Sequence, residues 1–323
     1  MVSTNITALL ATYINALHIL HYHGVLDGFG HLSVRNPNNP PTFFIMHSMA
    51  PALVSGLDDI GEYRVSDATP VDPGTEDAPL EVYIHSEILK RYPDVNVVLH
   101  GHPDELISYG ISDVPLKTVI HMAPFLGKKV PVFDITKYYR PNDTQDFLVR
   151  NQRLGAALAA EFDSPASCGP GNGTQDRNGN YHDKQHDDYN GDRDYCDDED
   201  HGGDHRTDQN DDHDRNHHSY PHHNLVLMQS HGFTAVATTI EIATYEGIYA
   251  VTNAKVQSGA LNIQHAYTGK AARGGNGIAY LNQRQIRDSW ATEIEVAERT
   301  WDLWVREVKV DPLYVNELDP GKY

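Results

Sequence analysis

The sequence is poor in cysteine and in long apolar runs. Of its 323 residues only Cys168 and Cys196 are cysteines, and both fall in one unusual segment, so the remainder has no disulfide framework. This absence fits a reducing compartment. No stretch approaches the roughly 18 consecutive apolar residues of a membrane span, and the first ten residues lack the basic and apolar regions of a signal peptide. We therefore expect a cytoplasmic protein without a membrane segment.

Basic residues are also scarce. The chain has 25 lysines and arginines against 45 acidic residues, which gives a formal net charge of −20. Half of this charge lies in residues 164–224, where fifteen acidic residues face five basic ones. A negative chain without a basic stripe argues against nucleic acid as a partner, so we expect none. Residues 164–224 also have almost no apolar side chains to offset the entropy of ordering, so we expect a disordered insertion.

Outside this insertion, apolar residues recur at helix and strand spacings. We expect helices over 4–24, 80–92, 143–161 and 240–259, and a C-terminal helical tail over 282–323 whose amphipathic part spans 282–308. We expect strands after the glycine turn at 27–35 and over 42–46, 63–66, 95–100, 130–133, 225–229 and 234–238. Alternating strands and helices predict a layered α/β domain with a central sheet, spanning 1–323 as one unit.

The strongest chemical signal is His100-Gly101-His102 at the end of an apolar run. Successive side chains of a strand alternate between faces, so the two imidazoles point the same way. Two imidazoles on one face form a bidentate clamp for a divalent metal ion that still needs further ligands. His231, after a later strand, and Glu81, beside a helix, are candidates to complete it. Spacing alone leaves a purely structural role for these histidines open.

Four ordered motifs resemble those of the class II aldolase/adducin family. Gly30 to Arg35 resembles its G-(N/H)-(I/L/V)-S-x-R pattern, and Glu81 to His85 its E-x-x-x-H pattern. Residues 91–102 resemble R-x-P-D-x-x-x-V-x-H-x-H, and His231-Gly232 follows a strand as the family's H-G does. The resemblance runs from about residue 7 to residue 268 around the insertion, and it is closer to fungal members than to the bacterial aldolases.

The resemblance implies a three-layer α/β/α domain with a central mixed sheet. It implies that His100, His102 and His231 ligate Zn²⁺, or another divalent ion that suits imidazole, and that Glu81 is both ligand and general base. His85 would either orient a ligand or serve only its own helix. Because family enzymes are tetramers with active sites between subunits, it also implies a homo-oligomer that takes a small-molecule substrate.

The chain departs from the sugar-phosphate members of the family where they bind phosphate. Pro79-Leu80 replaces their serine pair, and His31 stands where the aldolases have asparagine. Proline has no N–H and leucine no hydroxyl, so we expect a non-phosphorylated substrate. The candidate substrate contacts are His31, Ser33, Arg35 and Ser48, although Ser33 and Arg35 could serve only to tie down their strand.

The loop tyrosine that donates a proton in the aldolases is also missing, because His121-Met122 stands in its place. Tyr267 is the candidate replacement, with Tyr138 and Tyr139 as alternatives.

Three functions remain open from the sequence. The first is a metal-dependent carbon–carbon lyase, aldolase-like, that acts on a small hydroxy-carbonyl compound through a metal-stabilised enediolate. The second is a metal-dependent decarboxylase of a hydroxylated aromatic acid, which also needs an acceptor for the electron pair of a breaking C–C bond. The third is a non-catalytic, adducin-like interaction domain. The retained ligand set favours the enzymes, and among them the aldolase-like lyase.

Overall fold

A seven-stranded mixed sheet forms the centre of the part of the chain that the structure describes. This structure is a computed structural model that describes residues 4–75, 77–164, 219–269 and 277–319, so most of the expected insertion lies outside it. The strands are β1 (His31–Arg35), β2 (Thr42–Met46), β3 (Ile60–Arg64), β4 (Val97–Gly101), β5 (Val132–Phe133), β6 (Leu225–Met228) and β7 (Gly232–Ala237). They lie in the order β3-β2-β1-β4-β7-β6-β5, and all neighbours are antiparallel except β5 and β6. The predicted central mixed sheet is confirmed.

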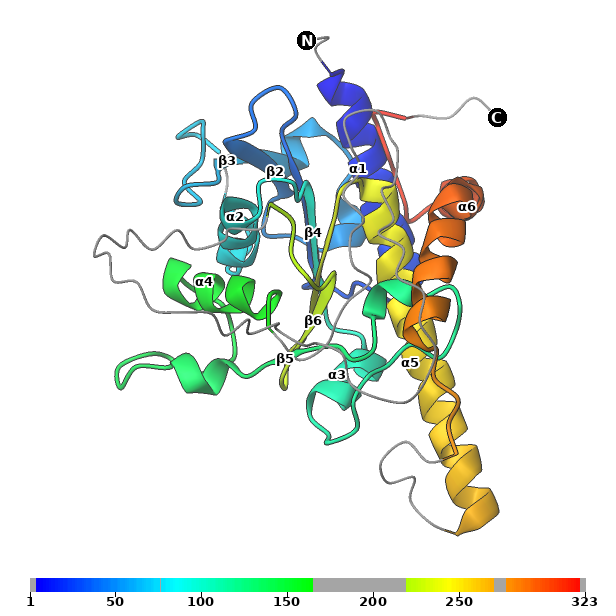
Figure 1. The fold of residues 1–323 in the computed structure, drawn as a ribbon. Coiled ribbons are helices and arrows are strands. Elements are labelled where there is room, and N and C mark those ends of the chain that lie inside the picture. The colour runs from blue at the N-terminus through cyan, green and yellow to red at the C-terminus, as the bar shows by residue number, and fades with distance from the viewer. Residues whose placement is uncertain (1–3, 76, 165–218, 270–276, 320–323) are drawn as a thin grey trace, which may run out of the picture.

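Helices cover both faces of this sheet (Figure 1). One layer consists of α1 (Ile6–Tyr22), α5 (Ile240–Thr268) and α6 (Gln283–Lys309), and the opposite layer of α2 (Val82–Arg91) and α4 (Gln152–Glu161). The short helix α3 (Asp104–Gly110) packs against α5, β6 and β7. Short 3-10 turns lie at Pro51–Leu53, Leu57–Asp59, Pro124–Leu126 and Ile135–Tyr138. The three-layer α/β/α arrangement predicted from the resemblance is confirmed.

Strand β4 is buried along its whole length and sends its side chains to two different layers. Leu99 packs on α5, where a Cβ on Gly247 would lie 2.7 Å from the Leu99 Cδ2 atom. Because strand side chains alternate, His100 points to the opposite layer, toward α2. The polar end of β4 therefore faces the layer that contains Glu81.

The structure corrects several element boundaries. The helix expected over 143–161 begins only at Gln152, because the Asn151 side chain accepts the Leu154 N–H and caps it there. The strand expected over 63–66 is β3, which lies slightly earlier, and α3 was not predicted.

The helix predicted to stop at Gly259 continues to Thr268 and ends at Gly269, whose φ of +64° suits a left-handed cap. None of the helices in the described ranges combines the length and apolar character that crossing a bilayer requires.

The close contact between α2 and α4 yields a stability prediction. A Cβ on Gly155 would lie 2.4 Å from the Tyr83 carbonyl oxygen, so Gly155→Ala forces the two helices apart. We expect this substitution to lower the free energy of unfolding by about 1–3 kcal/mol, measured by urea denaturation. The matched control is Gly259→Ala in α5, where a Cβ meets nothing within 4 Å and helix propensity should add about 0.5–1 kcal/mol. Equal effects of the two substitutions would contradict the close packing.

Candidate metal centre

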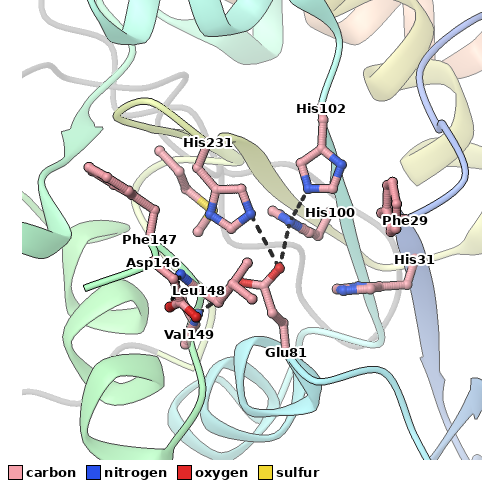
Figure 2. Close-up of polar contacts among 12 residues, drawn as sticks. Phe29, His31, Glu81, His100, His102, Asp146, Phe147, Leu148, Val149 and His231 are labelled. Atoms are coloured by element: carbon pink, nitrogen blue, oxygen red, sulfur yellow. Dashed lines mark hydrogen bonds and ion pairs between the residues drawn. The ribbon is translucent and has the colours of Figure 1, made fainter. Parts of the chain in front are cut away.

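Four side chains from separate parts of the sequence meet at one end of the sheet (Figure 2). His100 belongs to β4 and His102 follows it, His231 lies in the turn between β6 and β7, and Glu81 immediately precedes α2. One ligand atom from each of the four lies within 4.8 Å of the other three. The structure thus brings together the three histidines and the carboxylate that the sequence suggested as ligands.

The turn that carries His231 is tight. The His231 N–H donates to the Met228 carbonyl oxygen at 3.1 Å, and Ser230 has a φ of +57°, in the left-handed region that non-glycine residues seldom adopt. A Cβ on Gly232 would lie only 2.2 Å from the Gly101 carbonyl oxygen. The glycine after His231 therefore allows β7 to approach the His100-Gly101-His102 segment closely.

Glu81 is held with one oxygen directed at the histidines. Its Oε1 accepts the Val149 N–H at 2.8 Å, while its Oε2 lies 3.2 Å from Nε2 of His231 and 3.5 Å from Nε2 of His100. Val149 belongs to a loop in which Phe147 has a φ of +66°. A strained backbone segment thus fixes the carboxylate, and no sequence motif reveals this backbone donor.

The ring nitrogens are arranged as a cation would require. The Nδ1–H of His100 donates to the Phe233 carbonyl oxygen at 2.8 Å, and the Nδ1–H of His102 donates to Oδ1 of Asp27 at 3.1 Å. The Nε2 lone pairs of these two rings consequently face each other at 2.9 Å. Lone pairs at that distance repel unless a positive charge lies between or beside them.

His231 completes the pattern. Within the described residues, neither of its buried ring nitrogens makes a hydrogen bond, since the 3.2 Å contact with Glu81 lacks hydrogen-bond geometry. Buried polar atoms without partners are rare in proteins. One of them, Nε2, lies beside Glu81 Oε2 and converges with the lone pairs of His100 and His102, which fits the ligand set of a divalent metal ion.

The protonation states agree with this arrangement. Burial lowers the pKa of His100 to about 4, which leaves a neutral imidazole. Burial alone would raise the pKa of Glu81, but its close polar contacts and charge interactions with His100 and His231 outweigh this effect and hold its pKa well below the usual range. Neutral imidazoles with an ionised carboxylate suit Zn²⁺ and related divalent ions.

Asp27 is a site residue that the sequence analysis missed. Its Oδ1 accepts the N–H groups of Phe29 and Gly30, each at 2.9 Å, as well as the Nδ1–H of His102. The glycine turn therefore supports the metal cluster as well as starting β1. The available signal was an aspartate at the beginning of a glycine turn, which indicates a side-chain-to-backbone turn but not a histidine partner.

A cavity of about 570 Å³ opens beside the four clustered side chains. Glu81, His102 and His231 line it, together with two predicted substrate contacts, His31 and Ser48. Much of the remaining wall is apolar and comes from Phe29, Met46, Met49, Pro79, Leu80 and Leu148.

The other two predicted substrate contacts lie elsewhere. The Ser33 hydroxyl is fully buried against His85. The Arg35 guanidinium donates to the carbonyl oxygens of four residues and so ties β1 to neighbouring loops; these are Pro40, Leu89, Tyr92 and Val95. Both residues adopt the bracing role that the sequence analysis left open.

None of the three tyrosines suggested as proton donors lines this cavity in the described part of the chain. Tyr267 is 88% exposed near the C-terminal end of α5. The Tyr139 hydroxyl accepts the Phe147 N–H, and the Tyr138 ring stacks on Phe133.

Comparison with known proteins identifies a matching family model and relatives of the chain, one of which covers nearly its whole length. The family model described as "Class II Aldolase and Adducin N-terminal domain" matches residues 11–168. A protein named "Decarboxylase tropJ" from Talaromyces stipitatus is 37% identical over 308 residues, which cover 94% of this chain and 96% of that protein. A "3,4-dihydroxyphthalate decarboxylase" from Arthrobacter keyseri is 26% identical over 150 residues, 44% of this chain and 58% of that protein.

The fold also has a solved counterpart. An aldolase II superfamily protein from Pseudomonas syringae superposes with a TM-score of 0.60 at 14% identity, covering 97% of this chain and 96% of that one. The family model, the relative that covers nearly the whole chain and the fold all indicate the same family. The chain therefore belongs to the class II aldolase and adducin family, as one of its lyase enzymes.

Proposed function

We propose that the enzyme is a divalent-metal-dependent decarboxylase of a small, non-phosphorylated, hydroxylated aromatic acid. One observation carries the proposal: a chain with an intact cluster of three histidines and Glu81 is 37% identical, over 94% of its length, to a protein named a decarboxylase. The second relative is named for a dihydroxylated aromatic diacid. These names shift the preference from the aldol cleavage that the sequence alone favoured to decarboxylation.

The cavity supports an aromatic substrate. Phe29, Met49 and Leu148 offer apolar surface to a flat ring, and methionine sulfur makes favourable contacts with aromatic edges. Beside them, Pro79 lacks a backbone N–H and Leu80 lacks a side-chain hydroxyl, so neither of these groups is available to bind a phosphate. A ring that carries a carboxylate and hydroxyl groups matches this mixture of apolar wall and few polar groups better than a sugar phosphate.

The reaction replaces the bond between the ring and its carboxylate with a C–H bond, so carbon dioxide leaves and one proton reaches the ring carbon. A bound divalent ion would supply Lewis acidity toward the oxygen atoms of the substrate. Glu81 is ionised and lines the cavity, so it accepts the proton of a ring hydroxyl and returns a proton to the ring carbon as carbon dioxide departs. The phenolate oxygen that remains takes up one proton from water when the product leaves. The Val149 N–H holds this carboxylate in place throughout.

The substrate class is tested by measuring carbon dioxide release. Purified protein reconstituted with Zn²⁺ should release carbon dioxide from at least one member of a panel of hydroxybenzoates, dihydroxybenzoates and dihydroxyphthalates. Treatment with a chelator should abolish turnover, and added Zn²⁺ should restore it. Cleavage of hydroxy-aldehydes without any release of carbon dioxide from the panel would replace this proposal with an aldolase.

The role of Glu81 predicts a large effect of a conservative substitution. Glu81→Gln keeps the shape of the side chain but removes its basicity, so we expect kcat to fall roughly 10²–10⁴-fold. The control is Glu105→Gln, since Glu105 lies on α3 and pairs with Lys255 away from the cavity. A Glu81→Gln enzyme that retains more than about a tenth of the activity would rule out proton transfer by this carboxylate.

The contact between Asp27 and His102 predicts an effect on metal affinity. Asp27→Asn replaces a charged acceptor of the His102 Nδ1–H with a neutral one, and we expect Zn²⁺ affinity to fall roughly 10–100-fold in a competition titration with a chromogenic chelator. Asp72→Asn is the matched control, because among the described residues the Asp72 carboxylate accepts a single backbone N–H, that of Gly74, in an exposed turn. Equal affinities of the two variants would show that Asp27 serves only its turn.

A further inference from the structure

Behind one wall of the cavity, three buried side chains are linked by hydrogen bonds. Ser33 Oγ lies 2.7 Å from Nδ1 of His85, and Nε2 of His85 lies 2.7 Å from Nδ1 of His31. Ser33 and His85 are fully buried, and His31 is 2% exposed. We refer to these three residues as the Ser33–His85–His31 relay. His31 and Ser33 are two positions apart in β1, so they share a face of the sheet with His85 across from them.

The serine sets the direction of this relay. Within the described residues, the Ser33 hydroxyl has His85 as its hydrogen-bond partner and no other, so its proton must go to Nδ1 of His85 or remain buried without an acceptor. A neutral imidazole carries one N–H, and His85 therefore carries it on Nε2 and donates to Nδ1 of His31. By the same reasoning, His31 carries its own proton on Nε2.

The hydrogen-bond geometry of the relay needs only one proton on each ring, and burial favours this neutral form. Burial lowers the pKa of His85 to about 3, and burial together with the neighbouring His85 holds the pKa of His31 well below its usual range. With the direction set by Ser33, a second proton on His31 would place its Nδ1–H against the Nε2–H of His85, and a second proton on His85 would place its Nδ1–H against the Ser33 O–H. The relay therefore ends in a neutral N–H donor.

This donor lies at the reaction site. His31 lines the cavity with Glu81 and His231, and it faces His100 across the β1–β4 pairing with 4.9 Å between ring centroids. Figure 2 shows its ring directed from β1 toward the space between His100 and Glu81. In the described part of the chain, Nε2 of His31 has no hydrogen-bond partner, whereas Nδ1 is occupied by His85.

We propose that Ser33 and His85 fix the tautomer of His31 so that its Nε2–H binds an anionic oxygen of the substrate. His31 would touch the substrate, and Ser33 and His85 would act as positioning residues. Because the imidazole is neutral and its N–H has one orientation, it can donate a hydrogen bond to a carboxylate or phenolate oxygen without transferring the proton. A protonated Nε2 also has no lone pair, so the ring does not compete with the metal ligands for the ion. The identity of the ligand as a hydroxylated aromatic acid rests on the proposed function, but the direction of the relay does not.

The direction of the relay is measured by ¹⁵N NMR of the histidine rings in full-length protein reconstituted with Zn²⁺. His31 and His85 should both be protonated at Nε2 and not at Nδ1, with signals assigned by their loss in His31→Phe and His85→Asn. In Ser33→Ala the relay has no donor to orient it, so we expect a mixture of tautomers at His31. The matched control is Ser86→Ala, because Ser86 is equally buried, follows His85 in α2 and has no partner within the described residues. A proton on Nδ1 of His31 in the unaltered protein would overturn the inference.

Ligand binding is measured by calorimetric titration with 2,3-dihydroxybenzoate as the probe. His31→Phe keeps the ring but removes the donor, and we expect affinity to fall roughly 10–100-fold, as for a hydrogen bond to a charged group. His31→Asn keeps an N–H and should recover part of this loss. Ser33→Ala should weaken binding several-fold and Ser86→Ala should leave it unchanged.

Two results would contradict the inference. Affinity within twofold of the unaltered protein in His31→Phe would exclude the donor role, and equal losses in Ser33→Ala and Ser86→Ala would reduce the effect to general packing. If the unaltered protein binds neither this probe nor any acid of the panel, the proposed substrate class fails and the ligand assignment fails with it. The NMR measurement would still decide the direction of the relay.

Discussion

The whole site depends on the antiparallel pairing of β4 with β1 on one side and β7 on the other. In this register His31 lies opposite His100, and His100 lies opposite Thr234 just beyond the turn that carries His231. A slip of one residue in β4 would turn His100 toward α5 and bring Leu99 to the cavity. Both faces of β4 are buried, so the hydrophobic core that holds the sheet together also selects the register that assembles the candidate metal ligands.

Close backbone approach is the second requirement, and it explains the glycines that accompany the histidines. Gly101 and Gly232 face each other so tightly that a side chain on Gly232 would overlap the Gly101 carbonyl oxygen. A left-handed Ser230 then directs His231 back over the end of β4. In the short His-Gly-His and His-Gly patterns, glycine thus allows the close approach of two backbones and histidine supplies the ligand atom. Because both requirements must be met, the patterns are specific for this site despite their length.

These features explain how much the sequence could reveal. Strand alternation correctly placed His100 and His102 on one side, because that periodicity is a property of a single strand. Joining His231 and Glu81 to them needed the family resemblance, since no local pattern encodes which distant turns meet. The role of the Val149 N–H stayed hidden because a backbone donor leaves no trace in composition, and the role of Asp27 stayed hidden because its turn pattern does not indicate a histidine partner. The start of α4 was misplaced for a related reason: in residues 143–151, apolar spacing resembles a helix while side-chain bonds to the backbone, such as those of Asp146 and Asn151, hold another conformation.

The same bonding logic limits what the cavity can recognise. Each hydroxyl or phosphate oxygen of a sugar phosphate would need a partner on entering the site, and an unpaired buried polar group costs more than a lost apolar contact. Here Arg35 and Ser33, which were candidate substrate contacts from the sequence, already have internal partners, and the wall beside Glu81 is formed by Pro79 and Leu80. The polar groups that remain, chiefly Glu81, His31 and Ser48, lie around the ligand cluster and not along the apolar wall. The proposed substrate, whose oxygens are confined to one edge of an otherwise apolar ring, would satisfy this distribution better than a polyhydroxylated chain.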